Sequence, residues 1–256
     1  TIISDLENTP KGILLWRALL QWLGGIGIIV MAITLMPIMN VGGMQLFKIS
    51  STDTSEKILP KSKQISLSLI SIYLLLTLLC ASFYKIFGMN YFDSLTHSMT
   101  TLATGGFSNY NESIGFFNSN YIKITSIVFI LAGSIPFIAY IKFLGGDKKI
   151  FFKDTQIRAF INIIFISIFI MLIYLILFQN KSFSLDVIDI IFNIISILTG
   201  TGYVTTNFNN WGNFPLIFFL LLMFIGGCAG STTGGLKVFR FQILFKYLNL
   251  HLKRMI

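Results

Sequence analysis

The sequence has 256 residues, of which 54% are hydrophobic and only 11% are charged, and its mean hydropathy is +0.79. Long apolar stretches with almost no charge are typical of membrane spans and exclude an ordinary soluble domain. The formal net charge is +9, but the basic residues lie in short segments between apolar stretches, so we expect no nucleic-acid partner. The two cysteines, Cys80 and Cys228, lie in apolar segments without a Cys or His at ligand spacing. Neither a disulfide framework nor a zinc site is expected, and no cofactor is expected.

Five apolar segments are long enough to cross a bilayer, which requires about 20 residues. They are residues 16–37, 65–84, 121–143, 158–178 and 211–248. The last is too long for one plain span and its middle is rich in glycine, while Pro136 should kink the third span. Two further runs, 91–102 and 185–198, are too short to cross and are expected to be re-entrant or buried helices.

The basic residues predict the orientation of these spans. Fourteen of the nineteen Lys and Arg residues lie in three segments, residues 43–64, 142–158 and 237–256. By the positive-inside rule these three segments face the cytoplasm, and the five spans alternate consistently with that placement. Both short runs and the loops that follow them then lie on the outer side.

The order span, short helix, Thr/Gly loop, span occurs twice, at residues 65–143 and 158–248. At an offset of 96 residues, Leu102 pairs with Leu198, Gly106 with Gly202, and Phe107 with Tyr203. The first span fits as the closing half of an earlier unit, because its 22-WLGGIG-27 resembles 224-FIGGCAG-230 in the last span.

The repeat divides the chain into three parts. We expect the closing half of a first unit at 1–42, a second unit at 43–144, and a third unit at 145–256 whose last helix is broken by glycine. The sequence therefore looks like a fragment that holds about two and a half units.

The two Thr/Gly loops, 101-TLATGGFSNYN-111 and 197-ILTGTGYVTTN-207, are the first candidate site. A non-helical backbone is tolerated at membrane depth only where it is buried or lines a water-filled cavity. Several such loops around one axis would form a ring of carbonyl oxygens that replaces the hydration shell of an ion. The short helices should end near Leu102 and Leu198 and point about half a negative charge each toward the middle of the membrane, which favours a cation.

The candidate filter residues are Thr104, Gly105, Gly106, Phe107, Thr199, Gly200, Thr201, Gly202 and Tyr203. The glycines can turn carbonyls inward without a Cβ clash, the threonines can add hydroxyl oxygens or brace the loop, and the two aromatic rings can pack outward and hold its width. The ion itself is assigned to Thr104, Gly105, Gly106, Thr201 and Gly202. Ordinary surface turns are the alternative, and two loops in register make that alternative less favoured.

The second candidate site is 226-GGCAGSTTGGLK-237, which interrupts the last span with five glycines and three hydroxyl residues. Each glycine is about 1 kcal/mol worse than alanine inside a helix, so this stretch should unwind. We interpret it as a barrier to ions below the filter, and we expect little apolar packing to hold it. The barrier residues are Gly226, Gly227, Gly230, Ser231, Thr232, Thr233, Gly234 and Gly235. A phosphate-binding loop would need a G-K-[ST] ending that is absent here, while close helix packing through small residues remains an alternative.

Several other polar residues receive weaker predictions. The acids Asp93, Glu112, Asp186 and Asp189 lie on the predicted outer side and could attract cations, although helix caps or solvated faces are the favoured interpretation. His97 is expected to be a structural histidine with satisfied hydrogen bonds. Arg17 should extend to the outer interface.

Three segments of the chain resemble the Trk/Ktr potassium-uptake family: 14-LLWRALLQWLGGIGIIV-30, 93-DSLTHSMTTLATGGFS-108 and 223-MFIGGCAGSTTGGLKVFRF-241. The resemblance covers nearly the whole chain, and the last motif is the most specific. It implies an all-α integral membrane protein with four helix–pore loop–helix repeats around one pseudo-fourfold ion pore. Gly106 and Gly202 are then the second and third filter glycines, and Gly226 to Gly235 are an intramembrane gate. It also implies a homodimer, a cytosolic nucleotide-binding regulatory ring and a multi-pass location in the bacterial inner (plasma) membrane.

We therefore predict potassium uptake across the inner membrane through a channel-like filter with an intramembrane gating loop. A sodium-coupled or other secondary cation transporter with broken helices is the alternative; it predicts inverted repeats, whereas the two units here share one orientation. An intramembrane enzyme is the third class. It requires a nucleophile with a base, and neither histidine has a convincing acid or serine partner in the repeat pattern, so no catalytic residue is expected.

Overall fold

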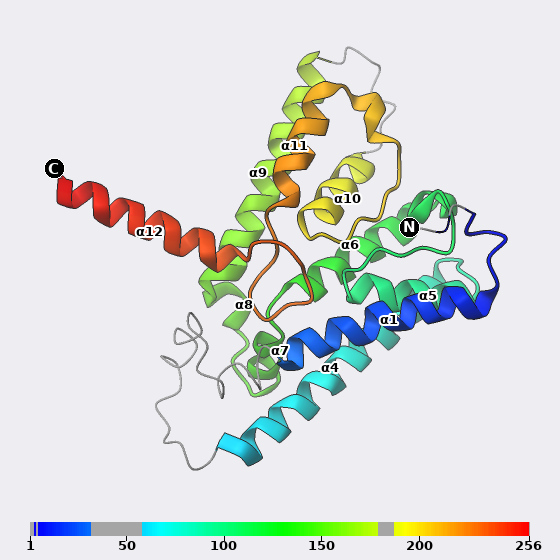
Figure 1. Cartoon of the computed structure of the whole chain (residues 1–256), viewed down its shortest axis with the longest axis horizontal. Coiled ribbons are helices and arrows are strands. Elements are labelled where there is room, and N and C mark those ends of the chain that lie inside the picture. Colours follow the sequence, from blue (N-terminus) through cyan, green and yellow to red (C-terminus); the bar gives the residue numbers. More distant parts are fainter. Residues whose placement is uncertain (1–2, 4, 32–57, 179–186, 256) are drawn as a thin grey trace.

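The structure, a computed structural model, describes residues 3, 5–31, 58–178 and 187–255 (Figure 1). In chain order the elements are α1 (Lys11–Val30), α4 (Ile58–Ile86), α5 (Tyr91–Leu102), the 3₁₀ turn η3 (Ser113–Phe117), α6 (Asn120–Ser134), α7 (Phe137–Leu144), α8 (Ile150–Lys153), α9 (Thr155–Phe178), α10 (Val187–Leu198), the 3₁₀ turn η4 (Phe208–Trp211), α11 (Asn213–Met223) and α12 (Val238–Met255). Within the described ranges the chain forms helices and loops with a single isolated bridge, between Ile225 and Leu236. The predicted all-α class is confirmed. Part of the first basic segment, together with Asp186, lies outside the described residues.

Within the part of the chain that the structure describes, three helices are long and apolar enough to cross a membrane, namely α1, α4 from Gln64 onward, and α9. They correspond to the first, second and fourth predicted spans, although residues 32–37 of the first lie outside the described residues. The outward faces of these helices carry large apolar side chains such as Phe165 and Phe169, which are 67% and 64% exposed. A lipid environment accounts for this exposure, because lipid tails are themselves apolar.

The third predicted span is broken in two. The helices α6 and α7 meet at an angle of 89° across Ile135 and Pro136. Proline lacks an amide hydrogen and clashes with the preceding turn of a helix. The expected kink at Pro136 is confirmed, and the bend is sharp enough to divide the span into two separate helices. Gly133 and Ser134 at the end of α6 are thereby left with carbonyl groups that a helix does not satisfy.

The two short runs form α5 and α10, each of 12 residues. At 1.5 Å per residue such a helix is about 18 Å long, little more than half of a bilayer core. Each packs in the same way: α5 lies against α4, α6 and the earlier helix α1, and α10 lies against α9, α11 and the earlier helix α6. The contacts of the short helices therefore repeat along the chain as the sequence pattern does.

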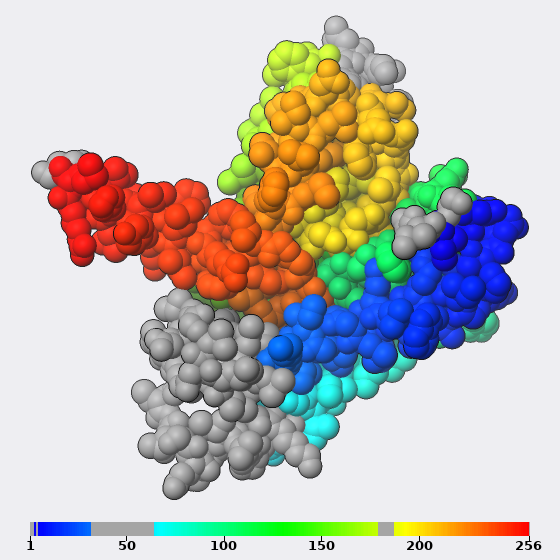
Figure 2. All heavy atoms as spheres, viewed as in Figure 1, coloured from blue at the N-terminus to red at the C-terminus, as the bar shows by residue number. Residues whose placement is uncertain are grey.

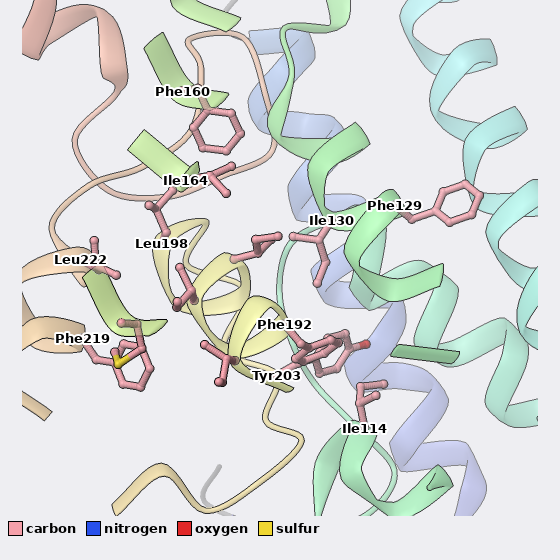
Figure 3. Packing of buried hydrophobic residues seen from close by; sticks show 14 of the residues in the cluster. Ile114, Phe129, Ile130, Phe160, Ile164, Phe192, Leu198, Tyr203, Phe219 and Leu222 are labelled. Carbon is pink, nitrogen blue, oxygen red and sulfur yellow. The ribbon is translucent and has the colours of Figure 1, made fainter. Parts of the chain in front are cut away.

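The two short helices are buried for different reasons. The helix α10 is mostly apolar, and Phe192 and Leu198 lie in the larger core cluster with side chains from α6, α9 and α11 (Figure 3). The helix α5 is rich in Ser and Thr, and its hydroxyls donate to carbonyls of the same helix, as Thr96 does to Phe92 O at 2.9 Å and Ser98 to Leu95 O at 2.8 Å. These hydrogen bonds remove the cost of burying the hydroxyls.

The last predicted span is divided into α11, a non-helical stretch over residues 224–237, and α12. The helix α11 packs in the bundle beside α9 and α10, whereas α12 leaves it sideways and projects as an arm (Figures 1 and 2). Among the side chains of α12, Val238 is buried and those from Phe245 onward are exposed. The stretch between the two helices returns toward the ends of α5 and α6.

Candidate ion filter and intramembrane loop

The first loop (residues 103–109) and the second loop (residues 199–205) follow the same backbone path. Thr104 and Gly106 have φ values of 48° and 73°, and the positions 96 residues later, Gly200 and Gly202, have φ values of 72° and 82°. A residue with a Cβ atom pays about 1–2 kcal/mol in this left-handed conformation. Thr104 therefore carries backbone strain at a position where the second loop has glycine.

Matching hydrogen bonds hold both loops in this shape. In the first loop the hydroxyl of Thr100 donates to Phe107 O at 2.9 Å, and the amide of Gly106 donates to Thr100 O at 3.4 Å. In the second loop Ser196 donates to Tyr203 O at 2.7 Å, and the amide of Gly202 donates to Ser196 O at 3.2 Å. The offset in all cases is 96 residues. A hydroxyl in the last turn of the helix before each loop, three residues ahead of it, thus fixes the backbone of that loop.

The two loops touch each other. An added Cβ at Gly106 would lie 1.9 Å from Thr201 O, which leaves no room for a side chain. The Tyr203 side chain is fully buried against α5, where its hydroxyl lies 2.5 Å from the Thr100 hydroxyl and donates to His97 O at 3.3 Å. The second loop is therefore anchored on the short helix that precedes the first loop.

The first loop is instead held by α1. Gln21 donates from Nε2 to Gly105 O at 2.9 Å, and its Oε1 accepts from the Phe107 amide at 3.3 Å. The Phe107 ring is 36% exposed, and the Arg17 guanidinium lies over it at 4.6 Å from the centroid. The Arg17 side chain therefore stacks on the ring of the first loop, and its extension to the outer interface stays a prediction.

Hydroxyls in the second loop contact each other. The hydroxyls of Thr199 and Thr201 lie 2.8 Å apart, and both side chains are buried. Thr199 also donates to Ile195 O at 2.8 Å. Both threonines therefore brace the loop from within.

Two acids mark the beginning of the short helices at the same offset. Asp93 is 3% exposed and accepts hydrogen bonds of 2.7 Å from Asn90, Asn109 and Tyr110. Burial and the neighbouring Asp93 raise the pKa of Tyr110 to about 12, so its phenol keeps the proton that it donates.

Asp189 takes the equivalent place on α10. It is 5% exposed and forms an ion pair of 2.6 Å with Lys123 of α6. Of the two favoured interpretations, solvated faces are wrong for Asp93 and Asp189, because each carboxylate is buried with partners that offset its desolvation. The helix-cap interpretation agrees with Asp93, which lies in the first turn of α5 and exchanges hydrogen bonds with the N-cap residue Asn90. Glu112 is exposed, as expected.

His97 is fully buried and satisfied on both sides of its ring. Its Nδ1 lies 2.9 Å from Asp93 O and its Nε2 lies 2.9 Å from the Ser108 hydroxyl. The predicted structural histidine is confirmed, and its partner Ser108 is a serine that the repeat pattern does not indicate.

The glycine-rich stretch forms a non-helical segment that we call the intramembrane loop (residues 224–237). Its glycines allow two parts of the segment to meet, because an added Cβ at Gly226 would lie 2.0 Å from Gly234 O. The amide of Gly226 donates to Leu236 O at 2.9 Å, and the Ser231 hydroxyl donates to Cys228 O at 2.6 Å. The predicted unwinding of the last span is confirmed.

Polar contacts also fasten the intramembrane loop to the break between α6 and α7. The amides of Cys228 and Thr232 donate to Ser134 O and Gly133 O, both at 3.1 Å, and the amide of Phe137 donates to Gly230 O at 2.9 Å. Little apolar packing was expected to hold this loop, but Cys228 lies in the larger core cluster and Ile225 packs against it. The hydrogen bonds to the broken span add to that packing.

The intramembrane loop lies directly against both filter loops. The Thr232 hydroxyl is 3.0 Å from Leu102 O, the last carbonyl of α5, and accepts from the Thr104 hydroxyl at 3.2 Å. An added Cβ at Gly200 would point toward Gly234 N at 3.9 Å. Lys237 closes the far end of the loop by donating from Nζ to the carbonyl and hydroxyl of Thr233.

Comparison with known families settles the relationship of this chain. A family model described as TrkH, cation transport protein, matches residues 1–255. The chain belongs to the TrkH family. The resemblance inferred from the sequence motifs is confirmed, and with it the class of multi-pass membrane proteins.

Individual TrkH relatives agree with the family match. The chain is 38% identical to the Trk system potassium uptake protein TrkI of Halomonas elongata, over the whole chain and 52% of the relative, and 37% identical to TrkH of Escherichia coli, over the whole chain and 54% of the relative. The chain superposes on the crystal structure of the potassium transporter TrkH from Vibrio parahaemolyticus with a TM-score of 0.87 at 35% sequence identity. The superposition covers the whole of this chain and 52% of the Vibrio chain. The chain spans about half the length of the relatives it matches.

Within this TrkH-family chain, the structure brings the predicted filter residues of both loops together with the intramembrane loop. Sequence reasoning missed the residues that hold them: Thr100 and Ser196, which fix the loop carbonyls, and Gln21, which bridges the first loop. The signal for the first two was present, since they occupy equivalent positions at the offset of 96. No periodicity in the sequence indicates Gln21, which lies 84 residues before Gly105.

Proposed function

We propose that the complete gene product containing this chain takes up potassium across the bacterial inner membrane through a filter that includes the first and second loops. The observation that carries the proposal is the stacking of two equivalent loops over one intramembrane loop, with Thr104 and Thr232 in contact at 3.2 Å. The names of the relatives, which are potassium uptake proteins, support the choice of ion.

In the proposed mechanism, K⁺ binds at Thr104, Gly105, Gly106, Thr201 and Gly202. The C-terminal ends of α5 and α10 direct partial negative charge toward these loops and favour a cation. Glycine at 106 and 202 permits the left-handed backbone that the loops require, and the buried hydroxyls of Thr100 and Ser196 keep the carbonyl positions fixed. K⁺ is the transported ion, and no cofactor takes part in the proposal.

The intramembrane loop is proposed as the gate. It lies against both filter loops, and three hydrogen bonds join its non-helical backbone to the α6–α7 break. The proposal also includes the three-part division of the chain at 42 and 144, a homodimer and a cytosolic nucleotide-binding ring that acts on this loop.

Transport is tested with the complete gene product purified into liposomes that carry a K⁺ gradient. We expect K⁺ flux that exceeds Na⁺ flux and needs no chemical turnover. Deletion of Ala229 to Thr233 should raise the resting K⁺ flux, because it removes the segment under the filter. Absence of K⁺ flux in the unaltered protein overturns the function, and unchanged flux in a deletion variant that inserts normally overturns the gate.

The orientation is tested by cysteine labelling of intact cells with an impermeant thiol reagent. Ser108 is 7% exposed and is a poor reporter, whereas Glu112 and Lys148 are exposed. We expect labelling of Glu112→Cys and none of Lys148→Cys. The native Cys80 and Cys228 are buried, so the unaltered protein serves as the blank. The opposite labelling pattern would overturn the topology.

A further inference from the structure

Thr232 occupies a special place between the intramembrane loop and the first filter loop. Its side chain is 6% exposed, and its hydroxyl lies 3.0 Å from Leu102 O and 3.0 Å from Gly133 O. A hydroxyl has one proton, so Thr232 donates to one of these carbonyls at a time. One carbonyl belongs to the last residue of α5, and the other lies near the end of α6, at the break in the third span.

The Leu102 carbonyl depends on this contact. It is one of the last carbonyls of α5, which have no partner within the helix, and Leu102 is fully buried. A buried carbonyl without a hydrogen bond is unfavourable. The Thr232 hydroxyl therefore covers the end of α5 for as long as the intramembrane loop stays in place.

The same hydroxyl also touches the strained residue of the filter. Thr104 has a φ of 48° and donates from Oγ1 to Thr232 at 3.2 Å or to Ala103 O at 2.8 Å. Strained non-glycine conformations persist where surrounding contacts hold them. The equivalent residue of the second loop is Gly200, which adopts a φ of 72° without such strain and has no side chain to reach the intramembrane loop.

We propose that Thr232 couples the gate to the filter. When the intramembrane loop moves, the end of α5 loses its donor and Thr104 loses a contact that holds its left-handed conformation. Opening therefore changes the ion preference of the first loop as well as clearing the path, while the second loop keeps its shape. This coupling rests on the proposed function of the two loops as filter and gate.

The test uses neighbouring threonines in the complete gene product, reconstituted in liposomes with K⁺ and Na⁺ fluxes measured separately. Thr232→Val removes the hydroxyl and keeps the shape, and we expect the K⁺-to-Na⁺ flux ratio to fall about fivefold, as for one buried hydrogen bond. Thr233 is the matched control, because its buried hydroxyl accepts from the Gly227 amide at 3.0 Å within the loop itself and has no filter partner among the described residues. Thr233→Val should raise the resting K⁺ flux and leave the flux ratio within about twofold.

Two further variants make the outcome decisive. Thr232→Ser keeps the hydroxyl and should restore the flux ratio, and Thr232→Ala should behave as the valine variant if valine prevents folding. In a Thr104→Gly background, which removes the strained side chain, Thr232→Val should change the flux ratio less than twofold. The coupling is overturned if Thr232→Val lowers the ratio no more than Thr233→Val does, or if its effect is the same in the Thr104→Gly background. Absence of K⁺ flux in the unaltered protein would instead overturn the proposed function.

Discussion

The first and second loops share a backbone path and differ in what holds them. Both have two left-handed residues at equivalent positions and a hydroxyl that binds the carbonyl of the aromatic residue. The second loop is then braced from within by Thr199 and Thr201 and anchored by the buried Tyr203. The first loop is bridged by Gln21 from another helix and touches the intramembrane loop through Thr104. The same backbone path is thus held in the second loop largely by its own side chains, whereas in the first loop it depends on contacts with α1 and the intramembrane loop.

The largest expected difference concerns the equivalent glycines Gly106 and Gly202. At Gly106 an added Cβ would lie 1.9 Å from Thr201 O, whereas at Gly202 it would meet nothing within 4 Å. Gly106→Ser should destabilise the protein by about 4 kcal/mol through overlap and strain and abolish K⁺ uptake. Gly202→Ser should fold with a smaller loss and reduce the preference for K⁺ over Na⁺, because its side chain extends into open space beside the filter backbone.

Thermal unfolding in detergent and uptake by cells that lack other K⁺ uptake systems distinguish these two outcomes. Equal loss of stability in both variants would contradict the contact between Gly106 and the second loop. Unchanged ion selectivity and affinity in Gly202→Ser would show that Gly202 is a turn residue alone.

The second difference concerns the buried acids at the start of α5 and α10. Asp189 is paired with the cation of Lys123, whereas the carboxylate of Asp93 accepts from neutral Asn and Tyr groups. Lys123→Met leaves a buried charge without a partner and should cost about 3 kcal/mol. Asp93→Asn loses part of its hydrogen-bond network and should cost about 1–2 kcal/mol.

The double variant Lys123→Met with Asp189→Asn is the control for this prediction. It removes the unpaired charge, so the free energy of unfolding should recover in part. If the double variant is no more stable than Lys123→Met alone, the ion pair does not account for the loss.

Local patterns in the sequence predict the elements of this fold better than the contacts between them. The short helix over 91–102, the break at Pro136 and the unwinding of 226–235 all follow from apolar run length, proline and glycine. The burial of Asp93 and Asp189 was not predicted, because it depends on Tyr110 and Lys123, which are distant in sequence and carry no periodic signal. The bonds that hold the intramembrane loop were missed for the same reason: Thr232 and Leu102 are 130 residues apart, and nothing in either segment specifies the other.

The third prediction concerns the bridge that Gln21 forms to the first loop. Gln21→Leu keeps the approximate volume and removes both hydrogen bonds to the first loop, at Gly105 O and the Phe107 amide. Its stability should fall by about 1–2 kcal/mol, because two backbone groups lose their partner. The K⁺-to-Na⁺ flux ratio should fall as well.

Leu20→Ala is the control, because this side chain lies on the same helix and is 53% exposed. It should leave the flux ratio unchanged, and an equal effect in both variants would contradict the bridge.

The smallest expected effect comes from making the loops alike. Tyr203→Phe places in the second loop the residue type that the first loop has at Phe107, and it removes only the hydroxyl that lies 2.5 Å from Thr100 and 3.3 Å from His97 O. The ring remains packed in the core (Figure 3), and the hydroxyls of Thr100 and Thr101 keep their hydrogen bonds with Phe107 O and Tyr84, so the loss should be about 1 kcal/mol of stability. Because Ser196 still holds the carbonyl of residue 203, the loop backbone should keep its path and K⁺ preference should change less than in Gln21→Leu. Unfolding and flux measured side by side test this order. A larger loss of selectivity in Tyr203→Phe than in Gln21→Leu would show that the second loop, rather than the first, depends on its neighbours for its shape.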